Sequence, residues 1–272
     1  MIEIKDLRFN YPGNKYNVFD GFNLTLKPNH VYGLLGKNGT GKSTLLYLIA
    51  GLLRPKAGQV TIDGKATKER TPDMLREIYI VPEEYNLPNL TMAQYIKIHK
   101  DFYPLFNENT LHRCLEEFEM PTEINFKYLS MGQKKKIYMS FAIASSCRFL
   151  LMDEPTNGLD IPSKAMFRKV VAGNLPEGST LLISTHQVHD IEQLLDHVII
   201  INPSTLLLNS SMEEITKKYE FTYRTANEMD ESVVYAEPSL QGNAVMAYRR
   251  EGSAETPVNL ELLFNAAILG KL

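Results

Sequence analysis

The hydrophobic pattern of the N-terminal part of the chain predicts short strands around one helix. Apolar and polar residues alternate, as in half-buried antiparallel strands, over residues 1–9, 22–26 and 59–63. Residues 30–35 and 78–81 are mostly apolar and predict buried strands. Residues 43–50, after the first of these, predict a helix. We therefore expect a small antiparallel β-layer beside the start of a buried sheet.

The pattern becomes helical between about residues 87 and 147. The best helix candidates are residues 92–102, 108–118 and 131–146. In the last of them, Ile137, Phe141 and Ala144 recur at helical spacing. This stretch predicts a helical subdomain inserted into an α/β domain.

Strands and helices alternate again after the insertion. Continuous apolar runs at residues 149–152 and 180–183 predict parallel strands covered on both faces. Crossover helices are predicted at residues 162–171 and 188–195, and further strands at 198–201 and 205–208. Residues 219–272 are more polar and less periodic, apart from a predicted helix at 259–269. We expect one main domain over residues 1–218 and a small C-terminal accessory region.

Composition supports a folded chain without a membrane span of its own. The 272 residues are 44% hydrophobic and 22% charged, which allows a large core. The net charge of −3 gives no electrostatic reason to expect nucleic acid as a partner. Cys114 and Cys147 match no metal-ligand spacing and suggest a reducing compartment. No segment reaches the roughly 18 uninterrupted apolar residues that a spanning helix needs.

A glycine-rich octet supplies the most specific chemistry. Residues 36–43 read Gly-Lys-Asn-Gly-Thr-Gly-Lys-Ser, the spacing of a loop that cradles phosphate with its backbone N–H groups. Lys42 is expected to reach the β- and γ-phosphates of ATP, and the Ser43 hydroxyl to ligate Mg²⁺. The nucleotide-binding residues expected here are Gly36, Lys37, Asn38, Gly39, Thr40, Gly41, Lys42, Ser43 and Thr44. The fold class is therefore predicted as α/β, a P-loop NTPase with a mostly parallel core sheet.

Two further motifs follow predicted strands, as Gly36 does. Asp153 and Glu154 come directly after one strand, and Thr185-His186 after the next. Ligands of parallel sheets bind at the carboxyl ends of strands, so we expect the three motifs to converge on one crevice. Asp153 would hold Mg²⁺, and Glu154 would orient and deprotonate the attacking water. Without the phosphate loop in the same chain, an acidic pair after a strand would be interpreted as an ordinary solvated turn.

With these motifs in order, residues 1–218 resemble the ATP-binding subunits of ABC transporters. Residues 129–133, Leu-Ser-Met-Gly-Gln, resemble the family's signature motif, and residues 157–160, Asn-Gly-Leu-Asp, its D-loop. The resemblance implies that Tyr11 stacks on adenine and that His186 contacts the γ-phosphate region. It also implies a head-to-tail dimer, in which the signature of one subunit contacts ATP held by the other. The residues implied in that contact are Ser130, Gly132, Gln133 and Asp160.

Several of these residues have simpler interpretations. Tyr11 sits in a possible turn, and Tyr16 competes for the stacking role. Ser130 is also a good N-cap for the following helix, a role compatible with anion binding. The lysines at positions 134–136 are interpreted mainly as a solvated helix face, although Lys136 falls where the family often has arginine. His186 alone would be an ordinary, partly buried histidine.

Two positions depart from the family pattern. Glu83, after Pro82, stands where the family usually has the Q-loop glutamine. A carboxylate at this position can approach Mg²⁺ or its waters, so Glu83 is a candidate metal residue with Ser43 and Asp153. It also adds negative charge near the triphosphate. Met131 replaces the middle glycine of the signature but keeps its backbone N–H.

The predicted function is ATP hydrolysis that powers a separate membrane permease. The expected partners are ATP, a second copy of the chain or a homologous subunit, and the permease, which places the protein peripherally at the cytoplasmic face of the membrane. The segment from Glu83 to Tyr95 is the expected permease contact, with Tyr85 and Tyr95 as candidate anchors and core packing as the alternative for Tyr95. Export is favoured by the resemblance. The alternatives are a soluble mechanical or regulatory ATPase of the same type, and a nucleotide-gated switch.

Overall fold

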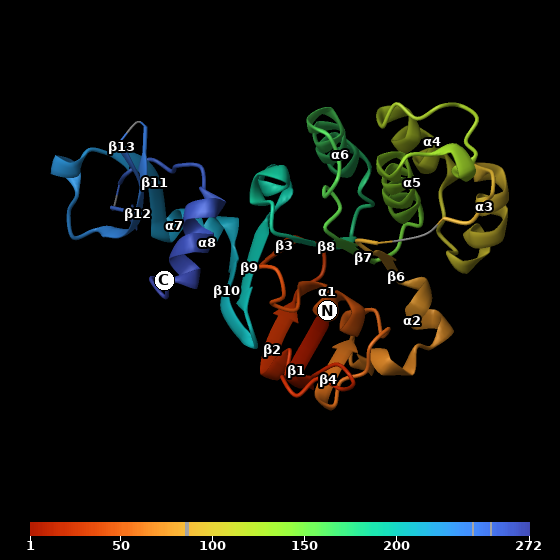
Figure 1. Cartoon of the computed structure of the whole chain (residues 1–272), viewed down its shortest axis with the longest axis horizontal. Helices are drawn as coiled ribbons and strands as arrows, with labels where there is room; N and C mark the ends of the chain where they lie inside the picture. Colours follow the sequence, from red (N-terminus) through yellow and green to blue (C-terminus); the bar gives the residue numbers. More distant parts are fainter. Residues whose placement is uncertain (85–86, 241, 251) are drawn as a thin grey trace.

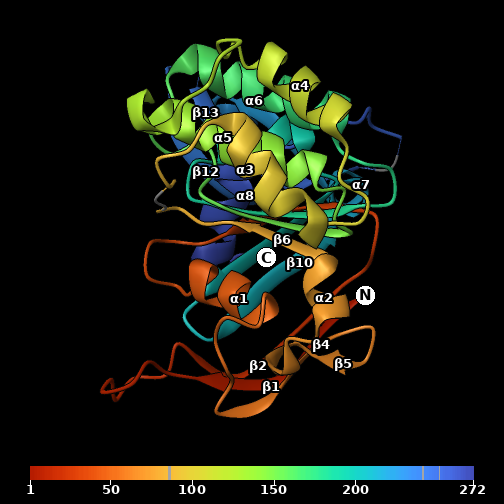
Figure 2. The same ribbon diagram turned by 90° about the vertical axis from the view of Figure 1, so that its right-hand side faces the viewer.

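The computed structural model describes residues 1–84, 87–240, 242–250 and 252–272, so the candidate anchor Tyr85 lies outside the described residues. Its long axis runs from the helical insertion at one end to the C-terminal region at the other (Figure 1). A six-stranded core sheet lies between them. Figure 2 shows the helices of the insertion above this sheet, and below it two short helices and a smaller antiparallel β-layer.

The β-layer is the antiparallel sheet that the N-terminal alternation predicts. Its strand order is β2-β1-β4-β5. The strands are β1 (Ile2–Phe9), β2 (Phe19–Leu26), β4 (Ala57–Ile62) and β5 (Lys65–Ala66). Ile4 lies opposite Leu24 on one neighbour and Val60 on the other, and all three are buried. The inward side chains of β1 are Ile2, Ile4, Leu7 and Phe9, with a register shift between Ile4 and Leu7, so the layer packs one face on α1 (Lys42–Ile49) and leaves the other exposed.

The core sheet has the strand order β10-β9-β3-β8-β7-β6. Its strands are β3 (Val31–Leu35), β6 (Ile78–Val81), β7 (Phe149–Asp153), β8 (Thr180–Thr185), β9 (His197–Asn202) and β10 (Thr205–Ser211). All neighbours are parallel except β9 and β10. This arrangement confirms the predicted α/β fold with a mostly parallel core sheet.

Both faces of the core sheet are covered, which explains its continuous apolar runs. Leu151 and Leu182 point to the face that packs with α1 and the β-layer. Leu150 and Leu181 point to the other face, which packs with α5 (Met131–Ala144) and α6 (Ile161–Asn174). With no solvent-facing side, β7 and β8 are apolar at their interior positions and carry polar residues only towards their ends.

The inserted helices are α3 (Met92–His99), α4 (Glu108–Glu117) and α5, each begun by a side chain that accepts a backbone N–H. Their aromatic core centres on Phe141, whose ring lies 5.1 Å from Tyr95 and 4.7 Å from Phe106. Tyr95 is 5% exposed, so core packing, and not the anchor role, accounts for it. A short helix, α2 (Pro72–Arg76), precedes β6 and was not predicted.

The predicted helix at residues 188–195 is wrong. The chain forms two short 3₁₀ turns there, Val188–Asp190 and Glu192–Leu194, separated by Ile191. Ile191 has a φ of −127° and is fully buried, which interrupts the helix. Leu195 then packs directly over Gly33, where an added Cβ would lie 2.4 Å from the leucine Cδ1. Tertiary packing therefore overrides a pattern that local spacing alone made helical.

The C-terminal region contains strands that its weak periodicity did not predict. After α7 (Met212–Lys218), the strands β11 (Tyr219–Arg224), β12 (Val233–Ser239) and β13 (Gly242–Tyr248) form an antiparallel sheet of order β11-β13-β12. No residue of β12 is fully buried, so its sequence shows little alternation. The predicted terminal helix is confirmed as α8 (Leu260–Ile268), which packs on β12, β13, β9, β10 and the first 3₁₀ turn.

Among the described residues, no helix is long and apolar enough to cross a membrane.

Candidate functional site

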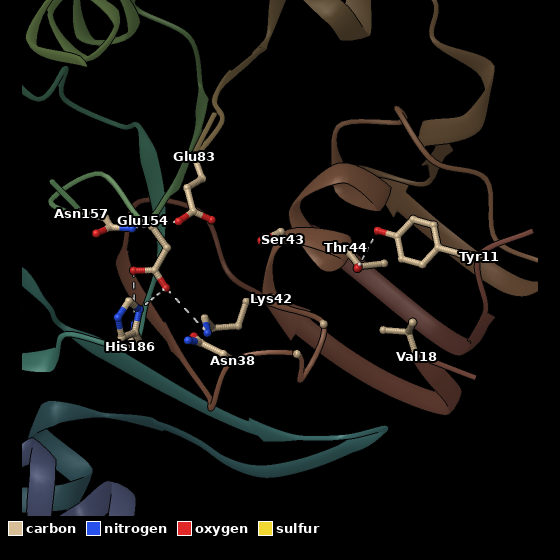
Figure 3. Close-up of a pocket in the computed structure, with 12 residues that line it drawn as sticks. Tyr11, Val18, Asn38, Lys42, Ser43, Thr44, Glu83, Glu154, Asn157 and His186 are labelled. Carbon is tan, nitrogen blue, oxygen red and sulfur yellow. Dashed lines mark hydrogen bonds and ion pairs between the residues drawn. The ribbon is translucent and has the colours of Figure 1, made fainter. Parts of the chain in front are cut away.

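The three motifs meet at one edge of the core sheet. Because β3, β8 and β7 are adjacent and parallel, Gly36, Thr185-His186 and Asp153-Glu154 emerge side by side at the carboxyl ends of these strands. Of these residues, Glu154 and His186 line a cleft of about 500 Å³ together with the phosphate loop (Figure 3), whereas Gly36, Asp153 and Thr185 lie outside its lining. Its lining comprises Tyr11, Val18, Asn38, Gly39, Gly41, Lys42, Ser43, Thr44, Glu83, Glu154, Asn157 and His186.

The phosphate loop has little room for a side chain at Gly36 and Gly41. Gly41 has a φ of +101°, and a Cβ there would lie 2.7 Å from Val18 and 2.9 Å from Phe19. A Cβ on Gly36 would lie 2.5 Å from the Thr40 hydroxyl, which donates to the Lys37 carbonyl at 2.9 Å. The loop therefore curls tightly before α1, whose N-terminal end carries the partial positive charge that favours phosphate.

Lys42 is buried at the start of α1. Its ammonium donates to the carbonyls of Gly36, at 2.8 Å, and Lys37, at 3.3 Å, and lies 3.7 Å from the Glu154 carboxylate. Burial lowers the pKa of Lys42, and the nearby carboxylates of Glu154 and Asp153 oppose that shift. The ammonium therefore lies in the cleft lining, and the two carboxylates partly neutralise its charge.

Asp153 ends β7 and is 1% exposed. One carboxylate oxygen accepts a hydrogen bond from the Ser184 hydroxyl. The other, Oδ2, is buried and has no hydrogen-bond partner among the described residues. Burial raises the pKa of Asp153, and contacts with the Ser184 and Ser43 hydroxyls oppose the shift. An orphaned carboxylate oxygen beside a serine hydroxyl fits the oxygen ligands that Mg²⁺ prefers.

Glu154 adopts a left-handed backbone conformation, with a φ of +44°, and is 4% exposed. Its carboxylate accepts hydrogen bonds from the Thr185 hydroxyl at 3.0 Å and the His186 N–H at 3.4 Å. The His186 ring contacts the other oxygen through Nδ1 at 2.8 Å. As Figure 3 shows, these contacts place the Glu154 carboxylate between His186 and Lys42 at the cleft wall.

Lys135 is a site residue that the sequence analysis missed. Its side chain is not solvated: it is 5% exposed, and its ammonium donates to the backbone carbonyls of Glu154, at 2.7 Å, and Asn157, at 2.9 Å. Burial lowers the pKa of this ammonium. The available signal was helical spacing, because Lys135 falls four residues before the buried Met139 on α5.

Lys136 also departs from the expected solvated face. Its ammonium contacts the Phe118 carbonyl at 3.3 Å and lies 5.8 Å from the centre of the Phe118 ring.

Glu83 lines the cleft, as predicted, but it also has a protein partner. Its Oε1 accepts a hydrogen bond from the Asn157 amide at 2.9 Å. Asn157 lies in the turn after β7, where its backbone carbonyl accepts a hydrogen bond from Lys135. The contact joins the segment after β6 to the loop after β7, two parts of the chain that the sequence did not bring together.

Tyr11 lines the cleft on the side opposite His186 (Figure 3), where its hydroxyl contacts the Thr44 hydroxyl at 3.0 Å. The edge of the Phe9 ring supports it, with the ring centres 5.1 Å apart. Tyr16 is 83% exposed and is not part of the cleft lining. This position favours Tyr11 over Tyr16 as the aromatic contact for a bound base.

The signature residues lie away from the cleft of their own chain. Ser130 caps α5: its hydroxyl accepts the Gln133 N–H at 3.2 Å, and the Gln133 side chain accepts the Ser130 N–H at 3.0 Å. Gly132 follows on the first turn, with Leu159 nearby. Asp160 caps α6 by accepting the Ser163 N–H at 2.9 Å. None of these residues lines the cleft.

A second, smaller hollow lies behind the phosphate loop. It measures about 220 Å³ and is lined by Leu35, Gly36, Lys37, Asn38, Thr185, His186, Val188 and Phe264. Phe264 belongs to α8, and Glu261 one turn earlier pairs with His189 at 3.0 Å. The C-terminal helix therefore abuts both the phosphate loop and the turn that follows His186.

Comparisons with known proteins agree with this geometry. A family model described as ABC transporter matches residues 19–157, slightly more than half of the chain. The ABC transporter ATP-binding protein YtrB of Bacillus subtilis (strain 168) is 27% identical over 220 residues, which cover 80% of this chain and 75% of that protein. The bacitracin transport ATP-binding protein BcrA of Bacillus licheniformis is 32% identical over 222 residues, 80% and 72% of the two chains.

The fold is shared with solved structures as well. A structure described as an ATP binding subunit of an ABC transporter aligns with a TM-score of 0.70 at 25% identity, over 79% of this chain and 91% of that chain. Other similar proteins carry names that refer to Nod factor export and to methionine import.

Proposed function

Because the chain belongs to the ABC transporter family, as an ATP-binding subunit with ATPase activity coupled to transport, we propose that it drives a separate membrane permease as a head-to-tail dimer. The observation that supports the assignment of residues is the convergence of Lys42, Glu154 and His186 on one cleft, with Asp153 buried beside Ser43 of the cleft lining. Tyr11 in the lining of that cleft would stack on the adenine.

Within the cleft, the phosphate loop would bind the triphosphate through its backbone N–H groups and the end of α1. The Lys42 ammonium would leave the carbonyls of Gly36 and Lys37 for the β- and γ-phosphates. The Ser43 hydroxyl and the orphaned oxygen of Asp153 would hold Mg²⁺, which when bound neutralises phosphate charge.

Glu154 is proposed as the general base that takes a proton from the attacking water. Its contacts with Thr185 and His186 fix both carboxylate oxygens, so the base is positioned before water arrives. In this proposal His186 orients Glu154 and faces the γ-phosphate region. Glu83, whose Oε1 accepts a hydrogen bond from Asn157 in the cleft lining, would act on the metal through water.

The exposed start of α5 is proposed as the contact with ATP held by a second copy. Ser130 and Gln133 satisfy each other as a cap, which presents the first turn of a 14-residue helix to the solvent. A helix end of this length attracts phosphate oxygens. Asp160, at the start of α6, would lie in the same dimer interface.

The permease is proposed to dock on a groove between α2, β6 and α3. This groove, of about 660 Å³, is lined by Ala50, Leu52, Arg70, Pro72, Leu75, Arg76, Ile78, Tyr79, Ile80, Tyr95, His99, Asp101, Phe102 and Tyr103. Phe102 is 62% exposed and Leu52 52% exposed, so these side chains, and not the buried Tyr95, would contact the partner. The groove directly adjoins the segment that follows β6 and carries Glu83.

We also propose the export direction. It is supported by the Pro82-Glu83 segment, which resembles that of exporter components. Proteins named for export and proteins named for import both match the chain, so the assay decides the direction. ATP-dependent accumulation of substrate in inside-out vesicles that contain the cognate permease supports export; accumulation only in right-side-out vesicles contradicts it.

The experiment that tests the catalytic assignment is Glu154→Gln. The amide keeps the size of the side chain and removes the base, so ATP binding should persist while turnover falls by about 10²–10⁴-fold, the usual contribution of a positioned base. With Mg-ATP, the variant should accumulate as a nucleotide-bound dimer measurable by light scattering. Full turnover would remove Glu154 from the base role, and a strictly monomeric variant, with and without permease, would refute the dimer.

A further inference from the structure

A cluster of two histidines and one aspartate lies at the sheet edge opposite the nucleotide cleft. His30 directly precedes β3, and Asp196 directly precedes His197, the first residue of β9. The two strands are parallel neighbours, with Tyr32 opposite His197. Their amino ends therefore bring the three side chains together, while their carboxyl ends belong to the region of the phosphate loop.

The distances between the three side chains suit a shared ion. The Asp196 Oδ1 atom lies 3.1 Å from His30 Nδ1 and 3.6 Å from His197 Nδ1. One ligand atom from each residue lies within 4.8 Å of the other two. A tetrahedral ion with bonds of about 2.0–2.1 Å separates its ligand atoms by roughly 3.3–3.4 Å. The two distances from Asp196 to the histidines, 3.1 Å and 3.6 Å, lie on either side of this ligand–ligand separation.

The backbone holds these residues in place. The other carboxylate oxygen of Asp196 accepts the Val31 N–H at 3.1 Å, and the Asp196 N–H donates to the Val31 carbonyl at 3.1 Å. The Asp196 carbonyl accepts the Met212 N–H at 2.9 Å. One oxygen of the carboxylate is thus fixed by the protein, and the other faces the two imidazoles. A hydrogen-bonded ligand of this kind is oriented before the metal binds.

His197 supplies the observation that points to a ligand. Its Nδ1 atom is buried and has no hydrogen-bond partner within the described ranges. Buried polar atoms are nearly always paired, so an orphaned imidazole nitrogen beside a carboxylate oxygen requires an explanation. The ring is held in position by Tyr32 and His30, whose ring centres lie 5.0 Å and 4.9 Å away.

We propose that His30, Asp196 and His197 bind a divalent transition-metal ion, with Zn²⁺ as the best match. Two imidazole nitrogens and one carboxylate oxygen suit Zn²⁺, Co²⁺ or Ni²⁺, whereas Mg²⁺ and Ca²⁺ prefer sites made of oxygen atoms. Asp196 is 49% exposed and His30 33%, so water completes the coordination. The ion joins the starts of β3 and β9 and stabilises the strand that carries the phosphate loop, without entering the chemistry of the cleft.

The test measures metal content of the untagged full-length chain after stripping with chelator and dialysis against Zn²⁺ without nucleotide. Wild type should retain one Zn²⁺ per chain, and its melting temperature should rise by about 5 °C at Zn²⁺ far above the dissociation constant. Mg²⁺ at the same concentration should produce no such rise. His30→Ala and His197→Ala should lose the ion, whereas the control His112→Ala, an exposed histidine on α4, should retain it.

Co²⁺ provides an independent measurement, because a four-coordinate site gives intense visible bands that His30→Ala should abolish. Circular dichroism and ATPase activity at the wild-type level show that His30→Ala is folded; if it is not, His30→Gln replaces it. Zn²⁺ content that is equal in wild type and both histidine variants would overturn the proposal, since the ion would then sit elsewhere, for example at the carboxylates of the nucleotide cleft. Absence of bound Zn²⁺ in wild type would leave the cluster as ordinary imidazole–carboxylate contacts and would overturn it equally.

Discussion

Replacing Lys135 with methionine tests how the signature helix is connected to the catalytic turn. The substitution keeps an unbranched apolar side chain one atom shorter and removes two charge-assisted hydrogen bonds, to the carbonyls of Glu154 at 2.7 Å and Asn157 at 2.9 Å. Each such bond contributes about 1.5–3 kcal/mol, but relief of the buried ammonium offsets part of the loss. We expect a net destabilisation of about 2 kcal/mol, or a fall in melting temperature of about 5 °C.

The catalytic effect should exceed the effect on stability. Glu154 has a left-handed backbone that Lys135 helps to hold, and displacement of a reacting group by about 1 Å costs on the order of 10² in rate. We therefore expect kcat to fall by about 10²-fold with little change in KM for ATP, because the phosphate loop is untouched. Lys135→Gln, a shorter side chain that still donates, should be intermediate.

The assay is steady-state ATP hydrolysis together with equilibrium nucleotide binding, measured below the melting temperature of each variant. Lys134→Met is the matched control, since the neighbouring lysine contacts neither carbonyl. If Lys135→Met keeps a kcat within about two-fold of wild type, the carbonyl contacts do not position Glu154 and this reasoning is refuted. An equal loss of kcat in Lys134→Met would show that the effect comes from removing a positive charge from α5 and not from the carbonyl contacts.

Three other outcomes are expected. Burial raises the pKa of Asp153 above 3.8, so its charged form costs stability at neutral pH; Asp153→Asn should melt at a higher temperature than wild type at pH 7 while losing Mg²⁺-dependent turnover, and the difference in melting temperature should shrink as the pH falls and vanish below 3.8, where the carboxyl becomes protonated in both the folded and the unfolded state. Tyr11→Ala should weaken ATP binding by about 5- to 100-fold, the range for lost stacking on a base, whereas Tyr16→Ala should leave it unchanged; equal effects in calorimetry would contradict the assignment. Lys42→Ala should weaken nucleotide binding itself, and undiminished affinity would argue against the loop assignment.

The parts of the site that the sequence predicts are those fixed by local backbone geometry. The phosphate loop and His186 follow strands that are buried on both faces, Asp153 is the last residue of another such strand, and the parallel sheet brings the strand ends to one edge. Strand identity and sheet order therefore place these residues without knowledge of any side-chain contact. The capping role of Ser130 was predictable for the same reason, because it involves residues three positions apart.

The contacts that were missed depend on how distant segments pack. Lys135 reaches the Glu154 carbonyl only because α5 docks against the loop after β7. The pairing of Glu83 with Asn157 joins residues 74 positions apart, and no local pattern encodes it. The strand β12 escaped notice because it is half-buried along its length, so its side chains do not alternate between core and solvent.

The seating of α8 has a practical consequence. Phe264 closes the hollow behind Lys37 and Asn38, and Glu261 grips His189, three residues beyond the histidine of the cleft. Removing the C-terminal region would remove these α8 contacts from the turn after His186 and would expose the phosphate loop to solvent on the side of Phe264. Turnover numbers measured on such a fragment would describe a less rigid catalytic site than that of the whole chain.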